Sequence, residues 1–161
     1  MIKKFNIFFI TFLSAGKVKY GPGTFASLIA CLIFFVLNFF FNFSFILIVL
    51  LIIFSYSFVA INNSFEEFDE DDPNEIVIDE VVGQILVLLG IPIYETLFLI
   101  NELYYYIGAF ILFRIFDVWK PYPINYVDNN VKGALGIMLD DVLAAIYSMI
   151  ILIIFFFFIG G

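Results

Sequence analysis

The sequence predicts an all-α, polytopic membrane protein with about four to five membrane-associated helices. Hydrophobic residues make up 64% of its 161 residues, and the mean hydropathy is +1.11. Soluble domains are only about half apolar, and long apolar segments with short polar stretches between them are typical of chains that cross a bilayer. The length corresponds to one domain. Residues 1–161 are therefore predicted to form a single membrane-embedded domain.

Charge and missing residue types exclude several classes of function. The net charge of -8 argues against a nucleic-acid partner, because nucleic-acid binding needs a basic surface. The chain has no histidine, which excludes a Ser-His-Asp triad, a phosphohistidine intermediate and His-ligated zinc. Its one cysteine, Cys31, lies in an apolar run and cannot form a disulfide within the chain.

The N-terminal region begins with a short amphipathic segment and a polar turn. Residues 1–13 combine two lysines with a short apolar run, which favours a retained interfacial helix over a cleaved signal peptide. Residues 17–24 contain Gly-Pro-Gly and are predicted to form a turn, with Thr24 as the cap of the next helix. Free N–H groups at a helix start bind anions, so Lys17, Gly23 and Thr24 are candidate substrate-binding residues. A plain capped turn is the simpler alternative.

Two predicted membrane spans and an acidic loop follow. The apolar region after the turn is too long for one span of about 20 residues, and Asn-Phe-Ser at 42–44 divides it into spans at 25–41 and 45–61. Residues 62–75 contain seven of the fifteen acidic residues. Such a run is usually a solvated loop, and no chemistry is assigned to it.

The next apolar segment carries two acidic residues that stand out. Asp79 and Glu80 interrupt the apolar helix pattern of residues 76–89, and charges beside a membrane helix cost a few kcal/mol each. The alternative is a pair of carboxylates favoured by the dipole of a helix start. Gly83 is expected to let a backbone or a ligand come close. With residues 93–116, this segment is predicted to form a hairpin that enters the membrane and returns.

Residues 112–141 hold three of the seven basic residues and four of the fifteen acidic ones. A charged stretch between apolar segments is usually functional. Lys120 follows Asp117 by three residues, which places them on one helical face or in a tight turn, and prolines then end the helix. A closing span is predicted at 142–159. The candidate residues of this stretch are Arg114, Asp117, Lys120, Asp128, Lys132, Asp140 and Asp141.

Topology and ligand chemistry together predict an active site at the membrane surface. Four lysines precede the first span, which places the N-terminus and all polar motifs on the cytoplasmic face. Carboxylates without histidine or thiolate ligands favour a hard cation, Mg²⁺, which neutralises phosphate charge and activates water. The predicted ligands are Asp79, Glu80, Asp117, Asp140 and Asp141. The predicted catalytic residues are Asp79, Glu80, Asp117, Lys120 and Asp141, with Arg114 and Lys132 as further substrate-binding residues.

Four motifs in order resemble the phosphatidylglycerophosphatase A family: PGTFASL, DPNEIVIDEVVGQ, FRIFDVWKPYPI and GALGIMLDDVLA. The family usually has glycine where Ala26 and Ala134 stand. The resemblance implies a Mg²⁺-dependent enzyme that converts phosphatidylglycerophosphate to phosphatidylglycerol and phosphate. It also implies a multi-pass protein of the bacterial cytoplasmic (inner) membrane, with the active site facing the cytoplasm and its substrate among the lipids of that leaflet.

Two other classes of function remain as alternatives. A small membrane transporter could use intramembrane carboxylates as ion sites, but it would place them near the midplane on repeated, discontinuous helices. The predicted charges lie at the ends of spans, and no internal repeat is visible. A structural subunit that scaffolds other membrane enzymes would leave the Lys-Pro and Asp-Asp motifs unexplained.

Overall fold

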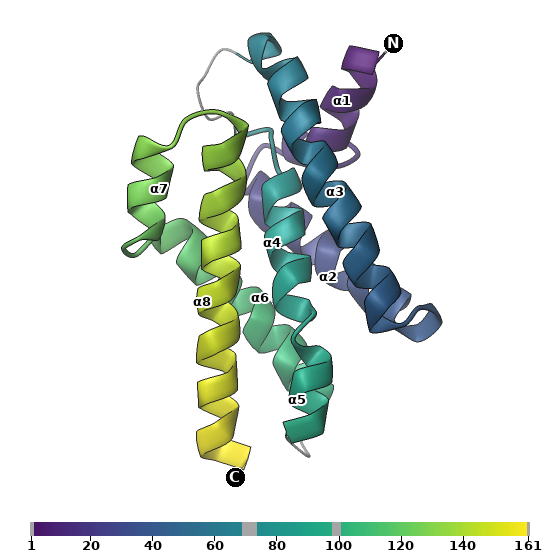
Figure 1. Ribbon diagram of the computed structural model, residues 1–161, viewed down its shortest axis with the longest axis vertical. Coiled ribbons are helices and arrows are strands. Elements are labelled where there is room, and N and C mark those ends of the chain that lie inside the picture. The colour runs from purple at the N-terminus through teal and green to yellow at the C-terminus, as the bar shows by residue number, and fades with distance from the viewer. Residues whose placement is uncertain (1, 69–73, 98–100, 161) are drawn as a thin grey trace.

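The computed structural model describes residues 2–68, 74–97 and 101–160, and over these residues it is helical without strands (Figure 1). This confirms the predicted all-α class. In chain order the elements are α1 (Ile2–Ile10), η1 (Ala15–Lys17), α2 (Pro22–Phe40), α3 (Phe43–Ser64), η2 (Phe65–Glu67), α4 (Ile78–Leu88), α5 (Ile91–Leu97), α6 (Glu102–Trp119), α7 (Ile124–Asn130) and α8 (Ala134–Gly160).

Among the residues that the structure describes, three helices are long and apolar enough to cross a membrane: α2, α3 and residues Ala134–Ile159 of α8. The division between α2 and α3 falls at the predicted turn, where Asn42 caps α3. Its side-chain oxygen accepts a hydrogen bond of 2.9 Å from the backbone N–H of Phe45, which satisfies one of the free donors of a helix start. The two predicted spans are thus confirmed to within a few residues.

Two predicted helix starts were wrong. Helix α2 begins at Pro22 with Gly21 at its N-cap, and Thr24 lies inside the first turn without capping it. Proline suits the first helical position because its φ angle is already helical and it lacks an N–H. Helix α8 begins at Ala134 after Gly133, whose φ is +70°, and not at residue 142. The two adjacent aspartates at 140 and 141 therefore lie in the first third of a long helix.

The predicted hairpin is formed by α4, α5 and α6. Helix α4 has 11 residues, so it is about 16 Å long and too short to span a bilayer. The chain turns at Leu89–Gly90 into α5, and α6 returns it. The Tyr105 hydroxyl of α6 donates a 2.9 Å hydrogen bond to the Val87 carbonyl of α4, which also accepts one from the Gly90 N–H. This bond joins the two arms at the C-terminal end of α4.

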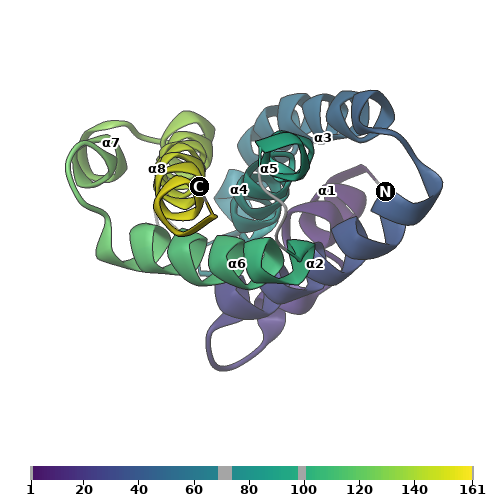
Figure 2. The same ribbon diagram turned by 90° about the horizontal axis from the view of Figure 1, so that it is seen from below.

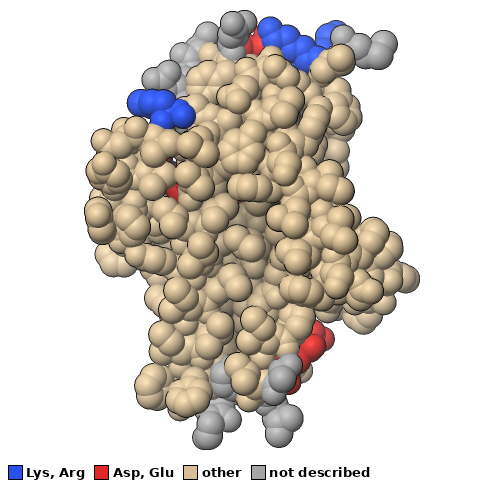
Figure 3. All heavy atoms as spheres, in the orientation of Figure 1, with Lys and Arg blue, Asp and Glu red and all other residues tan. Residues whose placement is uncertain are grey.

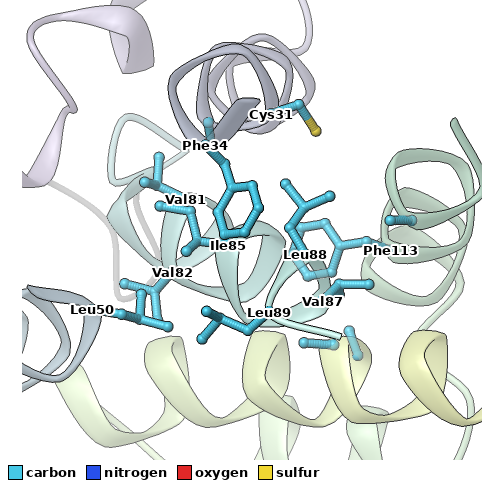
Figure 4. Packing of buried hydrophobic residues seen from close by; sticks show 14 of the residues in the cluster. Cys31, Phe34, Leu50, Val81, Val82, Ile85, Val87, Leu88, Leu89 and Phe113 are labelled. Atoms are coloured by element: carbon cyan, nitrogen blue, oxygen red, sulfur yellow. The ribbon is translucent and has the colours of Figure 1, made fainter. Parts of the chain in front are cut away.

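Helix α4 is the centre of the fold. Seen along the long axis, it lies inside a ring formed by α2, α3, α6 and α8 (Figure 2). Its valine, isoleucine and leucine side chains pack against Phe34 of α2, Leu50 of α3 and Phe113 of α6 (Figure 4). Fully buried alanines of α2 at 26 and 30 allow helices to approach closely. A short helix with two carboxylates is thus held inside the bundle by its apolar neighbours.

The surface agrees with a membrane protein. On the face drawn in Figure 3, the middle of the molecule is almost without charged side chains, and the Lys and Arg atoms appear toward its upper end. Many large apolar side chains of α2, α3 and α8 are exposed, as expected for helices that face lipid.

The N-terminal segment is helical, as predicted. Helix α1 packs on α3, where the Tyr56 hydroxyl donates to the Asn6 side chain at 2.7 Å and Lys3 pairs with Glu67 at 2.6 Å. Of the predicted acidic loop at 62–75, residues 69–73 lie outside the described part of the chain, and the loop's first residues belong to α3 and η2.

Candidate active site

Three carboxylates from two helices meet inside the bundle. Asp79 and Glu80 stand in the first turn of α4, and Asp141 is the eighth residue of α8. One oxygen of each lies within 4.8 Å of the others. Helices α4 and α8 pack side by side in Figure 1, with α7 and the C-terminal end of α6 beside them. Residues about 60 positions apart in the sequence therefore share one site.

Two glycines make this approach possible. A Cβ atom at Gly83 would lie 2.6 Å from the ring of Phe113 and 3.1 Å from the backbone carbonyl of Asp141. A Cβ atom at Gly23 of α2 would overlap the Glu80 carboxylate. The prediction that Gly83 permits a close approach is confirmed. The signal for Gly23 was its place at a helix start, but its neighbour, a carboxylate of α4, could not be read from the sequence.

Arg114 and Asp117 extend the cluster from α6. The Arg114 guanidinium forms an ion pair with Asp117, three residues later on the same helix. Its Nη1 atom also lies 3.9 Å from Glu80. All three side chains are mostly buried. One guanidinium thus lies between two carboxylates, and its charge partly offsets theirs in a medium where unpaired charges are costly.

Lys120 forms a second cluster beside the first. It ends α6 in the left-handed conformation, with φ of +46°, which turns its side chain away from the helix. The amine pairs with Asp128 of α7 and lies 2.7 Å from Asp140 of α8. Partial burial acts to lower the pKa of Lys120, but hydrogen bonds to Asp128 and Asp140 outweigh it and raise the pKa. Lys120 therefore stays cationic.

The predicted carboxylates thus divide between two neighbouring clusters. Asp79, Glu80 and Asp141 form the three-carboxylate cluster, whereas Asp140 faces Lys120 although it is adjacent to Asp141 in sequence. Consecutive residues of a helix point about 100° apart, which separates the two aspartates. The sequence analysis assigned Asp140 and Asp141 to one metal site because adjacency in sequence does not show which neighbour each side chain of a helix faces.

The other predicted substrate-binding residues lie at the surface. Lys17 and Thr24 are exposed near the start of α2, and Lys132 is exposed between α7 and α8. Lys17 lines a polar hollow of about 500 Å³ with Lys19, Pro22, Asn74 and Glu75. Of the predicted N-terminal residues, Gly23 is the one that the structure places against the carboxylates.

Burial controls the protonation of the α4 carboxylates. Desolvation raises the pKa of Asp79 well above its ordinary value, and neighbouring Glu80 adds to the effect. Desolvation also raises the pKa of Glu80, to about 7, although Asp79 and Arg114 act to lower it. A buried carboxylate holds its proton more tightly because the charged form loses its hydration. A cation at this position would replace those protons.

The donor set fits a hard divalent cation. One oxygen each of Asp79, Glu80 and Asp141 is buried without a hydrogen-bond partner. Buried polar atoms are nearly always paired in native proteins, so an unpaired oxygen on each member of one carboxylate cluster indicates a missing positive partner. Oxygen ligands without nitrogen or sulfur suit Mg²⁺. These three residues would hold such an ion.

The fold and the site together define a polytopic helical membrane protein with a buried carboxylate centre. The chain belongs to the phosphatidylglycerophosphatase A family, whose profile matches residues 8–156. Membership makes it a phosphatase, and it confirms the resemblance carried by the four sequence motifs. No solved structure matches the chain.

Three relatives illustrate the family. The "Putative phosphatidylinositol-3-phosphatase" of Bacteroides thetaiotaomicron is 35% identical over 93% of this chain and 92% of its own. The "Phosphatidylglycerophosphatase A" of Haemophilus influenzae is 34% identical over 85% of this chain and 80% of its own. The Escherichia coli protein of the same name is 39% identical, over 48% of this chain and 41% of its own.

Proposed function

We propose that the protein removes the terminal phosphate of phosphatidylglycerophosphate, with Mg²⁺ as cofactor, to give phosphatidylglycerol and phosphate. The observation that carries this proposal is the three-carboxylate cluster, in which Asp141 is buried and Asp79 and Glu80 are partly buried, with its orphan oxygens. Family membership supports phosphate removal as the reaction. The relatives named phosphatidylglycerophosphatase A support phosphatidylglycerophosphate as the lipid substrate. The carboxylates alone would repel a phosphate, and this is the reason the proposal includes a cation.

Each side chain then has a definite task. Mg²⁺, when bound, neutralises phosphate charge and lowers the pKa of a coordinated water. Asp79, Glu80 and Asp141 hold the ion. Lys120 and Arg114 are the cations beside the cluster and would contact phosphate oxygens, where positive charge stabilises the charge of the transition state.

The acidic residues that pair with Arg114 and Lys120 are proposed to hold these two side chains in place. Asp117 holds Arg114 next to Glu80, so the guanidinium keeps its place when no substrate is present. Asp128 and Asp140 hold Lys120 and keep it protonated. A positioned cation contributes more to catalysis than a mobile one because no reorganisation is needed during the reaction.

The position of the site suits a lipid substrate. The exposed apolar surface of the long helices places the protein in the bilayer, and the Lys and Arg atoms visible in Figure 3 gather at its upper end. Basic ends of membrane proteins face the cytoplasm. We therefore propose that the protein is an inner-membrane enzyme whose site faces the cytoplasmic leaflet, where it meets the headgroup.

The transporter alternative is less well supported. A transporter needs ion sites near the midplane, at broken helices of a repeated architecture. Here the carboxylates lie in the first turn of α4 and in the N-terminal third of α8, and the family is one of phosphatases.

The test is phosphate release by the purified protein in detergent micelles. Phosphatidylglycerophosphate, phosphatidylinositol 3-phosphate and soluble glycerol 3-phosphate should be compared at equal concentration. The proposal predicts the highest kcat/KM for phosphatidylglycerophosphate. A preference for phosphatidylinositol 3-phosphate would mean that the substrate is the lipid named for the Bacteroides relative and not phosphatidylglycerophosphate. No release from either lipid, with Mg²⁺ present, would contradict the proposal.

A further inference from the structure

Gln84 is a buried amide without a partner. Its side chain has no solvent exposure, and both its oxygen and its nitrogen lack a hydrogen bond within the described structure. A buried polar group that is left unpaired loses its hydration without compensation. The residue lies on α4, one helical turn after Glu80. A glutamine at such a position indicates a task that an apolar residue could not perform.

On its own helix, Gln84 has one polar neighbour within reach of its side chain. Residues three and four positions away share a helical face, which for Gln84 means Glu80, Val81, Val87 and Leu88. The last three are apolar and buried. Glu80 has an orphan oxygen of its own, Oε2, which is buried and accepts no hydrogen bond. An orphan donor and an orphan acceptor thus stand one turn apart.

The direction of the side chain favours their pairing. Side chains on a helix lean toward its N-terminus, so the amide of Gln84 leans toward Glu80 and the carboxylate cluster. Toward the C-terminus the same face continues with fully buried Leu88. Gly23 and Arg114 approach the other oxygen of Glu80, Oε1. A carboxylate oxygen has two lone pairs, so Oε2 can accept from Gln84 and still face the ion.

We propose that Gln84 is a positioning residue for the cation site: its side-chain N–H donates to Glu80 Oε2 and fixes the orientation of that carboxylate when the ion is bound. This inference rests on the proposed cation site. Residues that hydrogen-bond metal ligands set ligand orientation and affinity. Gln84 does not contact substrate or the ion in this account, so its effect passes through Glu80.

The variants Gln84→Met and Gln84→Leu test this assignment, because they keep an apolar side chain of similar size and remove the amide. Leu88→Met is the matched control, since it changes a buried residue on the same face one turn further along. The measurement is the thermal unfolding midpoint in detergent as Mg²⁺ is titrated. Phosphate release is measured in parallel at limiting and at saturating Mg²⁺.

The proposal predicts opposite effects on stability and on ion binding. Without Mg²⁺, the Gln84 variants should unfold at the wild-type temperature or above it, because two orphan atoms are gone. The Mg²⁺ concentration for half-maximal stabilisation should rise about tenfold or more. Phosphate release should fall at limiting Mg²⁺ and largely recover at saturation. Leu88→Met should keep the wild-type Mg²⁺ midpoint.

Three results would overturn the proposal. A wild-type Mg²⁺ midpoint in both Gln84 variants would show that Glu80 needs no support from the amide, while leaving the cation site intact. Failure of both variants to fold, with Leu88→Met folded, would make the amide structural. No Mg²⁺-induced shift in the wild-type protein would remove the cation site itself and this inference with it.

Discussion

Lys120 and Asp140 lie 2.7 Å apart although 20 residues separate them in the sequence. The pair joins the end of α6 to α8, and Asp128 of α7 completes it from the other side. The adjacent residue of α8, Asp141, faces the three-carboxylate cluster. One pair of aspartates therefore serves two tasks: one aspartate holds a cationic side chain and the other belongs to the proposed ion site.

Removing the charge of Lys120 should separate catalysis from ion binding. Lys120→Met is expected to lower phosphate release by about 100-fold or more, because a positioned charge near the transition state is lost, while the Mg²⁺-induced rise in the unfolding midpoint survives. The change also leaves Asp128 and Asp140 without their cation, which is costly.

A double variant controls for that cost. Lys120→Met combined with Asp140→Asn should regain stability without regaining activity. Recovery of activity in the double variant, measured by phosphate release, would show that Lys120 acts only through the ion pair.

Gly23 should be sensitive to a single methyl group. The Cβ atom of a Gly23→Ala variant would occupy the place of the Glu80 carboxylate. Because the helix backbone fixes the position of a Cβ atom, Glu80 must move, and the Mg²⁺ requirement for activity should rise. Gly108→Ala is the control, since its Cβ would meet the flexible end of Leu152 at 2.7 Å. Equal Mg²⁺ titration curves for the two variants would count against the predicted role of Glu80.

The pH dependence of Mg²⁺ activation follows from the buried carboxylates. Burial raises the pKa of Glu80 to about 7 and that of Asp79 above its ordinary value. Below pH 7 the protonated form of Glu80 dominates, and a metal ion must displace that proton. The Mg²⁺ concentration for half-maximal activity should therefore rise as the pH falls from 8 to 6. A titration series that shows the same midpoint at both pH values would mean that these groups do not bind the ion.

Orientation in the membrane can be tested by cysteine labelling. Asn63 at the end of α3 and Asn129 in α7 are both exposed, and the account places both on the cytoplasmic side. In a Cys31→Ala background, cysteines at these positions should be protected from an impermeant thiol reagent in intact cells and should react after lysis. Labelling of both from outside would reverse the orientation.

The sequence predicted the spans and the hairpin because their signals are local. The polar turn at Asn42 and the break at Gly90 interrupt apolar runs, and such breaks fall where a span ends or where protein surrounds the chain. The predicted starts of α2 and α8 were too late, because they too were inferred from the residue types near each helix end. Thr24 has the chemistry of a cap, but Pro22 had the stronger preference for the first helical position.

The division of the site into two clusters could not be predicted. Asp79, Asp117 and Asp141 were grouped by residue type and by a shared membrane side, which requires no coordinates. Their partners depend on helix rotation and on contacts between distant segments, such as the approach of Gly23 to Glu80. The importance of Gln84 was hidden for a further reason: an amide becomes conspicuous only when its burial and the absence of a partner are known.

The central claim is that Asp79, Glu80 and Asp141 together hold a catalytic Mg²⁺. The most direct measurement combines Mn²⁺ binding, followed by electron paramagnetic resonance, with phosphate release from phosphatidylglycerophosphate. It compares the wild-type protein with Asp79→Asn, Asp141→Asn and the double variant, and uses Glu67→Gln as the surface control. The two single variants keep the shape of the side chain and remove one charge.

We predict that each single variant stays folded, binds Mn²⁺ more weakly and loses activity by about 100-fold or more. The double variant should be little worse than either single variant, since the residues act as one unit. Glu67→Gln should match the wild-type protein, and excess chelator should abolish wild-type turnover. Full turnover in excess chelator, or unchanged Mn²⁺ binding in both single variants, would contradict the claim.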